Sequence, residues 1–354
     1  MTCRSAFLVL TAALAAAAGP RADACTTFCA RSGDAVLFAR NYDFEIGDGV
    51  LLVNTRGLHK QGFLERGPGW TAAYGSVTFN QFGRDFPMGG MNEKGLVVEL
   101  MWLDQTRYPE PDRRSELGVL EWIQYQLDTA ATVEQVLASD EVVRIAGTAP
   151  LHYLVSDATG AVATVEFLDG RLVSHRGTAL PVAVLTNSTY EDSLRFWRRH
   201  GESSLPRGSA SEARFARAAT QVKQLARLSG PAAVEAAFAI LANVAQSSTR
   251  WSVVYDQSAR EVYFRTDHRP AIRSLRLDGQ DFSCRLPARF LDLDTEAAGD
   301  VAPRLRPYTT DVNRTLVEKD YAASSVTRRT PPAEVAAIAA HPETATCTLP
   351  TSHW

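Results

Sequence analysis

The chain alternates between series of short strands and blocks of helix. Short runs rich in β-branched and aromatic residues, bounded by turn residues, predict a first strand series within 25–103. A second series is predicted within 151–187 and a third within 251–277. The predicted helices are 116–128, 132–139, 190–200, 210–228 and 230–244. Strand series separated by helical blocks favour an α+β fold, with antiparallel sheets covered by helices, over an alternating parallel sheet.

Two local patterns refine this expectation. The segment "CTTFCA" (25–30), the turn "SGD" and the segment "AVLFAR" (35–40) predict a β-hairpin, which returns Arg40 and the residues after it towards Cys25. From about 295 the chain is rich in Pro, Thr and Arg, and its hydrophobic periodicity is weak. We interpret 295–354 as an extended tail packed on the body, with a short helix near 332–340.

The first 24 residues have the features of a secretory signal peptide. Arg4 precedes an apolar stretch at 6–18, and Ala22-Asp23-Ala24 has the A-x-A form of a signal-peptidase site. Cleavage between Ala24 and Cys25 predicts a periplasmic or secreted chain, 25–354, that folds as a single domain. A lipoprotein signal also ends at a cysteine, but Ala22 stands where that signal requires a leucine. The apolar stretch is shorter than the ~20 residues of a membrane span, so no stable membrane insertion is expected.

Export to an oxidising compartment makes the cysteines informative. An extended chain separates Cys25 from Cys29 by roughly 13 Å, whereas disulfide-bonded Cα atoms lie within about 7 Å of each other. Cys284 and Cys347 are candidates for a bridge that secures the C-terminal tail. Cys25 is left without an evident structural role.

Several classes of function find no support in the composition or the motifs. A formal net charge of −3 over 354 residues does not indicate a nucleic-acid partner. The seven histidines lack metal-ligand spacing, and the sequence contains no dinucleotide-binding, phosphate-binding or zinc-protease motif. We therefore expect neither a metal nor a cofactor.

A cysteine at a mature N-terminus carries its own base. The free α-amine has a pKa of about 8, so part of it is unprotonated at neutral pH beside the thiol. A neighbouring guanidinium favours the reactive thiolate. If the hairpin forms, Arg40 can bias Cys25 towards the thiolate while Asp43 holds the amine. The alternative interpretation is that Arg40 and Asp43 form a solvated surface pair.

Together with Cys25, four segments resemble the choloylglycine hydrolase family, which includes penicillin V acylases and conjugated bile salt hydrolases among the N-terminal-nucleophile hydrolases. These segments are "RNYD" (40–43), "GGMNEKGL" (89–96), "VLTNS" (184–188) and "ARFARA" (213–218). The resemblance extends over about 25–280. It implies a four-layer αββα sandwich of two antiparallel sheets between helices, and it is associated with homotetramers.

The family roles transfer to matching positions. The resemblance implies Cys25 as the nucleophile, with its amine as the base, and Arg40 and Asp43 as the pair that positions it. Asn187 would be an oxyanion-hole donor, although Asn187-Ser188-Thr189 is also a glycosylation sequon. Arg214 matches the family arginine. Because Ala213 replaces the serine of the family segment, Arg217 remains an alternative for the inward position.

Pocket residues follow from the same resemblance. Trp102 falls beside the nucleophile, where its backbone N–H could be the second oxyanion donor and its indole would narrow the acyl pocket. The alternative is that Trp102 is a core aromatic residue. Met101 and Phe44 are further candidates for binding substrate. In "NEKG", Gly95 is expected to have a positive φ angle in a hairpin turn.

The resulting hypothesis is an exported amidase that cleaves linear, non-peptide C–N amide bonds of a small-molecule acyl amide through an acyl-enzyme at Cys25. By resemblance, the substrates would be phenoxyacetyl-type penicillins, N-acyl homoserine lactones and conjugated bile salts, in that order given Trp102. Three alternatives stay open: a lipid-anchored binding protein acylated at Cys25, an inactive member of the fold that binds acyl amides, and an acyltransferase in which an amine replaces water.

Overall fold

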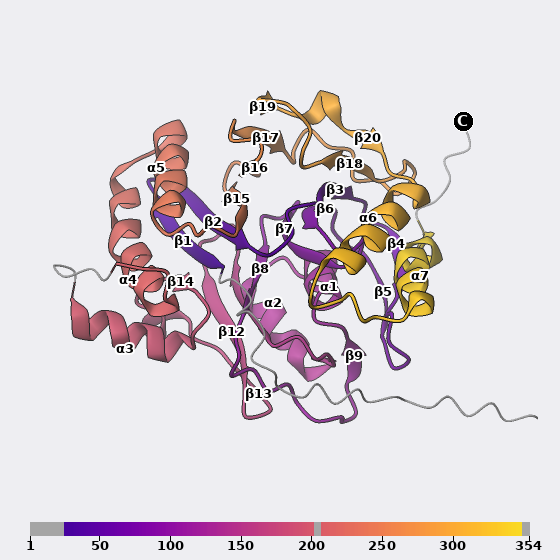
Figure 1. Ribbon diagram of the computed structural model, residues 1–354, viewed down its shortest axis with the longest axis horizontal. Coiled ribbons are helices and arrows are strands. Elements are labelled where there is room, and N and C mark those ends of the chain that lie inside the picture. Colours follow the sequence, from indigo (N-terminus) through magenta and orange to yellow (C-terminus); the bar gives the residue numbers. More distant parts are fainter. Residues whose placement is uncertain (1–24, 202–206, 349–354) are drawn as a thin grey trace, which may run out of the picture.

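The computed structural model describes residues 25–201 and 207–348, so the predicted leader, 1–24, lies outside the described residues. Two large sheets form the centre of the described part (Figure 1). The first sheet has the strand order β14-β1-β2-β15-β16-β17-β19. Its strands are β1 (Thr26–Ser32), β2 (Ala35–Asp43), β14 (Val184–Leu185), β15 (Thr249–Asp256), β16 (Glu261–Thr266), β17 (Arg273–Arg276) and β19 (Gly299–Asp300).

The second sheet has the order β13-β12-β11-β8-β7-β6-β3-β18-β20. Its strands are β3 (Val50–Asn54), β6 (Ser76–Asn80), β7 (Pro87–Asn92), β8 (Val97–Trp102), β11 (Leu151–Ser156), β12 (Val162–Leu168), β13 (Arg171–Val173), β18 (Arg289–Asp292) and β20 (Arg306–Pro307). Short strands outside both sheets are β4 (Leu58–Gln61), β5 (Gly69–Thr71), β9 (Ser115–Leu117), β10 (Val143–Ile145) and β21 (Thr346–Cys347). Apart from β17 with β19, the neighbouring strands of the two large sheets pair antiparallel.

Helices complete a four-layer sandwich, which confirms the predicted architecture. Helices α4 (Ser211–Gln221) and α5 (Gly230–Asn243) pack on the first sheet, with α3 (Tyr190–His200) against α4. Helices α1 (Glu121–Thr129) and α2 (Val133–Ala138) pack on the second sheet. Short 3₁₀ helices are η1 (Ser139–Glu141), η2 (Gly177–Ala179), η3 (Val222–Arg227), η4 (Ala302–Arg304) and η5 (His341–Thr344). Among the described residues, no helix has both the length and the apolar character needed to cross a bilayer.

Aromatic side chains join the two sheets in the interior. The ring of Tyr255 on β15 lies 6.2 Å from Phe38 on β2 and 6.3 Å from Phe79 on β6. Phe79 also lies 5.6 Å from Phe264 on β16. All four rings are buried, and these three contacts are edge-on, an arrangement that stabilises a core beyond the area it removes from water. This core fixes the two sheets relative to each other beneath the site.

The N-terminal hairpin forms as predicted. In the β1–β2 pair, Thr27 lies opposite Arg40 and Thr26 lies opposite Asn41. The predicted positive φ angle of Gly95 is also confirmed. It is +84° in the turn between β7 and β8, a conformation that residues with a side chain rarely adopt. There the side chain of Asn92 accepts from the backbone N–H of Leu96 and donates to the carbonyl of Leu127.

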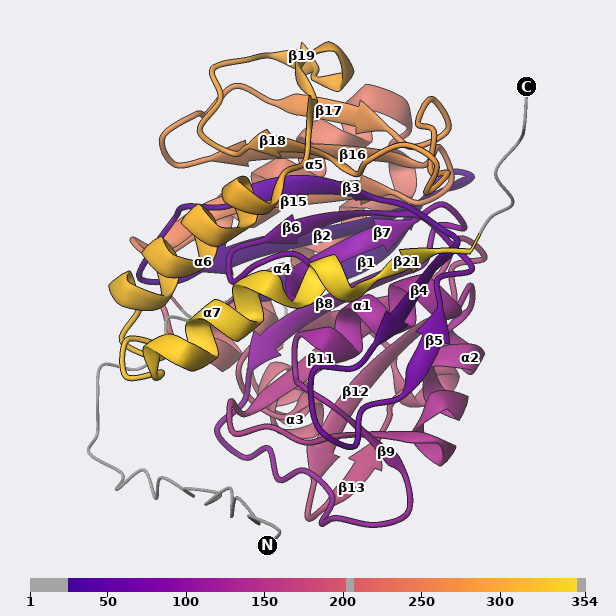
Figure 2. The ribbon, with the colours of Figure 1, turned by 90° about the vertical axis from the view of Figure 1, so that its right-hand side faces the viewer.

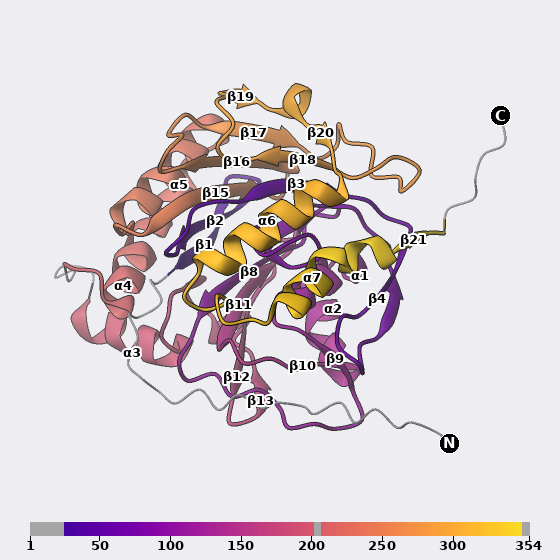
Figure 3. The same cartoon turned by 45° about the vertical axis from the view of Figure 1, so that its right-hand side comes forward.

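Two expectations are corrected. The helix predicted over 116–128 begins only at Glu121, because Ser115–Leu117 pairs in parallel with β10. The tail after 295 is not mainly extended. It contains the predicted short helix, α7 (Pro332–Ala340), and a longer one, α6 (Thr310–Ala323), whose Thr309 side chain accepts from the N–H of Val312 as an N-cap. The two helices pack against each other and lie in front of the second sheet (Figures 2 and 3).

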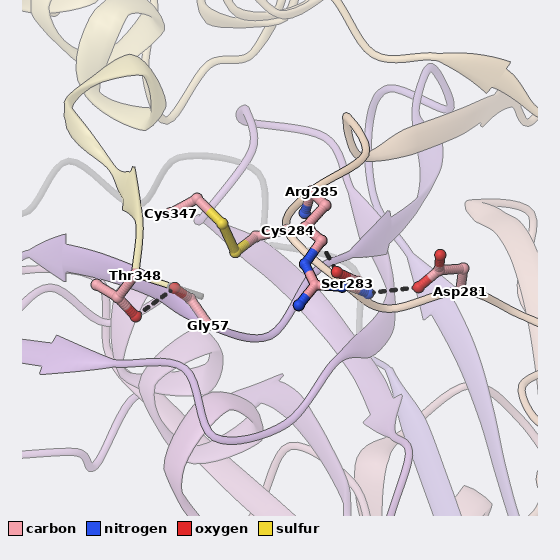
Figure 4. Close-up of a disulfide and its surroundings, with 7 residues drawn as sticks. All are labelled: Gly57, Asp281, Ser283, Cys284, Arg285, Cys347 and Thr348. Carbon is pink, nitrogen blue, oxygen red and sulfur yellow. Dashed lines mark hydrogen bonds between the residues drawn. A yellow bond between two sulfur atoms is a disulfide. The ribbon is translucent and has the colours of Figure 1, made fainter. Parts of the chain in front are cut away.

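The Cys284–Cys347 disulfide is confirmed. The two Cα atoms lie 5.6 Å apart and are separated by 63 positions in the sequence. Next to the bridge, the hydroxyl of Thr348 donates to the carbonyl of Gly57 at 2.8 Å (Figure 4). The end of the α6–α7 segment is therefore fastened to the body both covalently and by a hydrogen bond.

Candidate active site

Cys25 lies immediately before β1 and is buried, with 4% of its surface exposed. The antiparallel hairpin brings the end of β2 beside it. Nη2 of Arg40 lies 3.8 Å from the Cys25 sulfur, and the sulfur lies 3.8 Å from the backbone carbonyl oxygen of Asp43. The predicted placement of both residues beside Cys25 is confirmed.

The guanidinium of Arg40 is held from its far side. Its Nη1 donates to the carbonyl of Met88 at 2.5 Å and forms a buried ion pair with Glu99 on β8. The hydroxyl of Tyr255 donates to the other oxygen of Glu99 at 2.6 Å. Burial disfavours the charge on Arg40, but Glu99, Cys25 and Tyr42 together outweigh burial and raise the pKa of Arg40. The guanidinium beside Cys25 therefore stays positively charged.

A glycine makes room for this ion pair. A Cβ atom added to Gly89 would lie 1.9 Å from a carboxylate oxygen of Glu99. No side chain can occupy position 89 while Glu99 keeps its place. The first glycine of "GGMNEKGL" is therefore required by the close approach of Glu99.

The carboxylate of Asp43 has two protein donors. Nε2 of Gln246 donates to Oδ2 at 3.0 Å, and the hydroxyl of Thr249 donates to Oδ1. Burial raises the pKa of Asp43, while these two hydrogen bonds and the nearby arginines oppose that rise. The two donors orient the carboxylate at the end of β2.

Arg214 is the inward arginine of "ARFARA". Its Nη1 donates to the backbone carbonyl of Cys25 at 2.8 Å and to the hydroxyl of Thr26 at 2.6 Å. Its Nη2 donates to Oδ1 of Asn187 at 3.0 Å. Arg217 lies one turn of α4 further on, and its Nη1 donates to the carbonyl of Gly208. The structure therefore selects Arg214 over Arg217.

Asn187 follows β14, the edge strand beside β1. Its Oδ1 accepts from Arg214, and its Nδ2 donates to the carbonyl of Trp102 at 2.8 Å. An amide nitrogen carries two N–H groups, and among the described residues the second has no acceptor, so it can donate to an oxyanion. The side chain is half-buried and bonded on both sides, which favours a role in the site over a glycan attachment point.

The preceding residue fixes the position of Asn187. Nε2 of His152 donates to the carbonyl of Thr186 at 2.6 Å, and Nδ1 of the same ring lies 3.3 Å from Glu166. The hydroxyl of Thr186 lies 2.9 Å from that of Ser211 at the start of α4. The peptide before Asn187 is therefore held from β11 and from α4.

Burial and the neighbouring charges shift the pKa of the Cys25 thiol in opposite directions. Burial raises the pKa of its thiol, Arg40 lowers it, and the Asp43 carboxylate raises it, with a net rise. Burial therefore favours the protonated thiol over the thiolate in this environment. A thiolate needs a base that removes the proton as the substrate arrives.

A cavity of about 360 Å³ opens beside Cys25, within the range of about 300–1,000 Å³ typical of small-molecule sites. Phe44 and Trp102 line it, as predicted. Met101 does not: it is fully buried, because successive side chains of β8 point to opposite faces, and Leu100 and Trp102 take the cavity side. The assignment of Met101 to the pocket is thus corrected.

Several site residues were missed by sequence reasoning. They are Glu99, Thr26, Gln246, Thr249 and the cavity-lining residues of the C-terminal segment. Glu99 had a usable signal, since one carboxylate inside the apolar run "VVELM" must find a buried partner. Within 25–201 and 207–348, no cluster of three or more His, Cys, Asp or Glu side chains could hold a metal ion.

Comparisons with known proteins identify the family of the chain. The family model "linear amide C-N hydrolases, choloylglycine hydrolase family" matches residues 25–290. A penicillin V acylase of Pectobacterium atrosepticum is 29% identical over 263 residues, which cover 61% of this chain and 69% of that protein.

Solved structures share the fold. The penicillin V acylase of Agrobacterium tumefaciens superposes with a TM-score of 0.73 at 29% identity, covering 80% of this chain and 98% of that one. A mutant of the conjugated bile acid hydrolase of Clostridium perfringens superposes with a TM-score of 0.63 at 17% identity, covering 80% and 96%. At that identity the second match supports the fold alone.

Proposed function

The chain belongs to the choloylglycine hydrolase family of linear amide C–N hydrolases, and we propose that it cleaves its amide substrate through Cys25 by way of an acyl-enzyme. One observation carries the proposal: Cys25 lines the cavity, and its sulfur lies 3.8 Å from the Arg40 guanidinium, which is paired with Glu99. The favoured substrate is a penicillin of the phenoxyacetyl type, because relatives at 29% identity are penicillin V acylases. An N-acyl homoserine lactone is the second candidate.

In the proposed first half-reaction, the α-amine of a mature N-terminal Cys25 takes the thiol proton. The thiolate attacks the acyl carbon, and negative charge moves onto the carbonyl oxygen. The free N–H of Asn187 stabilises this oxyanion. The C–N bond then breaks, the amine product leaves with the proton returned by the α-amine, and a thioester remains on Cys25.

In the second half-reaction, the α-amine takes a proton from water, and the resulting hydroxide attacks the thioester carbon. The C–S bond breaks, the acid is released and the thiol is restored. Asp43 holds the protonated amine through both steps, and Arg40 stabilises the thiolate. This scheme makes removal of residues 1–24 essential, because an amide nitrogen at Cys25 has no basic lone pair.

We also propose export to the periplasm or beyond the cell. The "ADA" sequence before Cys25 supports it, and so does the Cys284–Cys347 disulfide, since disulfides persist in oxidising compartments. Conjugated bile salts rank last as substrates, because the Trp102 indole lines the cavity and narrows it for a steroid acyl group.

Intact mass spectrometry of protein expressed with its leader tests this proposal. Incubation with penicillin V or a long-chain N-acyl homoserine lactone should add one acyl group to a chain that begins at an unmodified Cys25. Cys25→Ala should abolish the adduct. Cys29→Ala is the matched control and should retain it, because the Cys29 thiol faces Ser156 at 3.3 Å rather than the cavity.

The alternatives predict other outcomes. A lipid-modified or uncleaved N-terminus would contradict the N-terminal mechanism. Ligand binding without adduct or product would identify an inactive binding protein. New amides formed when an amine is added would identify an acyltransferase.

A further inference from the structure

The cavity beside Cys25 is closed partly by residues that lie beyond the matched family region. That region ends at residue 290, yet six lining residues come from the segment 321–338, here called the C-terminal wall. They are Tyr321, Val326, Thr327, Thr330, Glu334 and Ile338. A part of the chain that the family model does not match thus borders the proposed acyl site.

Aromatic contacts connect the C-terminal wall to the catalytic strand. Tyr321 lies 5.6 Å from the ring of Phe82, which lies 6.0 Å from Phe44, and Phe44 lies 5.7 Å from Tyr42 on β2. All four residues line the cavity. One continuous aromatic surface therefore leads from the strand beside Cys25 to the end of α6.

Polar contacts fix the C-terminal wall to the loop after β2. The hydroxyl of Ser324 donates to Glu45 at 2.7 Å, and the N–H of Ser325 donates to the same carboxylate oxygen. On α6, Lys319 forms an ion pair with Asp48 at 2.7 Å. The disulfide at Cys347 fastens the far end. The C-terminal wall is thus a positioned surface beside the site.

The lining of the cavity has a clear chemical character. Most of it is apolar, and among the described residues it holds two carboxylates, Asp43 and Glu334, and no lysine or arginine. Val326 is 49% exposed although it is apolar, and it borders the cavity. Such a lining favours an uncharged acyl chain. Its two carboxylates repel an acyl group that carries a negative charge.

We propose that the C-terminal wall determines acyl-group specificity. Tyr321 and Val326 contact the distal part of a neutral aromatic or aliphatic acyl group, and Glu334 disfavours acyl groups that end in a carboxylate. The inference rests on the proposed function, since it assigns the acyl side of the substrate to this cavity.

Chain-length preference gives the first test. The substrates are N-acyl p-nitroanilides with acetyl, hexanoyl and dodecanoyl groups, and the variant is Val326→Trp. We expect kcat/KM for dodecanoyl to fall about tenfold while that for acetyl changes by less than about twofold. Val142→Trp is the matched control, since Val142 is 58% exposed and does not line the cavity. A uniform change across the three chains, or none, would overturn the inference.

Charge preference gives the second test. Glu334→Lys should raise kcat/KM for an acyl group ending in a carboxylate, relative to its neutral methyl ester, by about threefold. Glu235→Lys on α5 is the control, because it makes the same charge change at another exposed position. An equal ratio in the two variants would overturn the role of Glu334.

Binding separates this inference from the proposed function. Calorimetry with Cys25→Ala measures affinity for the same amides without any turnover. If the wild type is acylated neither by these amides nor by penicillin V or a long-chain N-acyl homoserine lactone, and hydrolyses none of them, the proposed function fails. The C-terminal wall is then supported if Val326→Trp selectively weakens dodecanoyl binding to Cys25→Ala, and it is rejected if acetyl and dodecanoyl affinities change alike.

Discussion

The two sides of the cavity are held by different forces. On the Cys25 side, buried charged and polar groups such as Arg40, Glu99 and Arg214 meet at hydrogen-bond distance. On the side of the C-terminal wall, aromatic packing, one exposed ion pair, hydrogen bonds to Glu45 and a disulfide hold the segment. Chemistry requires fixed distances and charges, whereas recognition of an apolar chain requires only shape. Mutations should therefore separate reaction from recognition.

Arg40→Gln should have the largest effect, because it leaves the Glu99 carboxylate buried without its cation. We expect the free energy of unfolding to fall by about 3–5 kcal/mol, measured by urea denaturation. Arg40 also lowers the pKa of the Cys25 thiol. Its loss raises that pKa further, so the alkaline limb of the pH profile of kcat/KM should move to higher pH.

The double variant Arg40→Gln/Glu99→Gln is the control for this change. It removes both charges, so stability should largely return while activity stays low. If activity returned together with stability, Arg40 would be a structural residue and not a partner of the thiolate.

Asn187→Ala should lower kcat about 100- to 1,000-fold, as expected for the loss of one oxyanion donor. KM should change little, because the interaction is made in the transition state. Steady-state kinetics measures both constants. Thr189→Ala is the matched variant: it removes the glycosylation sequon without touching the Asn187 amide, and it should keep kcat near the wild-type value.

The double variant Cys284→Ser/Cys347→Ser should reduce stability by about 2–4 kcal/mol, measured by thermal unfolding. Its effect on activity should depend on the substrate. Hydrolysis of an acetyl amide should persist, while the preference between acetyl and dodecanoyl chains should weaken as the C-terminal wall loses its anchor. Equal loss for both chains would mean that the two sides of the cavity are not separable.

Thr249→Val should have the smallest effect, about 1–2 kcal/mol, because it removes the hydrogen bond to Asp43 and the one that the Thr249 hydroxyl accepts from the backbone N–H of Gln246. The bond to Asp43 lowers the pKa of that carboxyl, so the pKa rises in the variant. Asp43 then becomes protonated at a higher pH, and the acid limb of the pH profile of kcat/KM should move to higher pH. Ser248→Ala is the control, since that hydroxyl makes no hydrogen bond among the described residues. An unmoved acid limb would separate Asp43 from catalysis.

Features that depend on a few consecutive residues could be predicted from the sequence. The hairpin places Arg40 beside Cys25 because a tight turn fixes which residues face each other. Gly95 needs a positive φ in a turn only a few residues long. Both features could be predicted without knowledge of the rest of the chain.

Non-local features could not be predicted in the same way. Thr249 reaches Asp43 across 206 positions of sequence, and a lone threonine carries no signal of such a contact. Met101 was predicted as a pocket residue, but strand alternation places its side chain on the other face of β8. Helix α6 was missed because its apolar positions are sparse and its burial depends on packing against β3 and β18.

Gly89 marks a limit for protein engineering of this cavity. Its missing side chain is the space that the Glu99 carboxylate occupies, so each of the other amino acids would displace the ion pair that holds Arg40. A library that seeks new substrates should keep position 89 fixed and randomise the exposed residues of the C-terminal wall. Variation there alters the shape offered to the acyl group while the nucleophile keeps its surroundings.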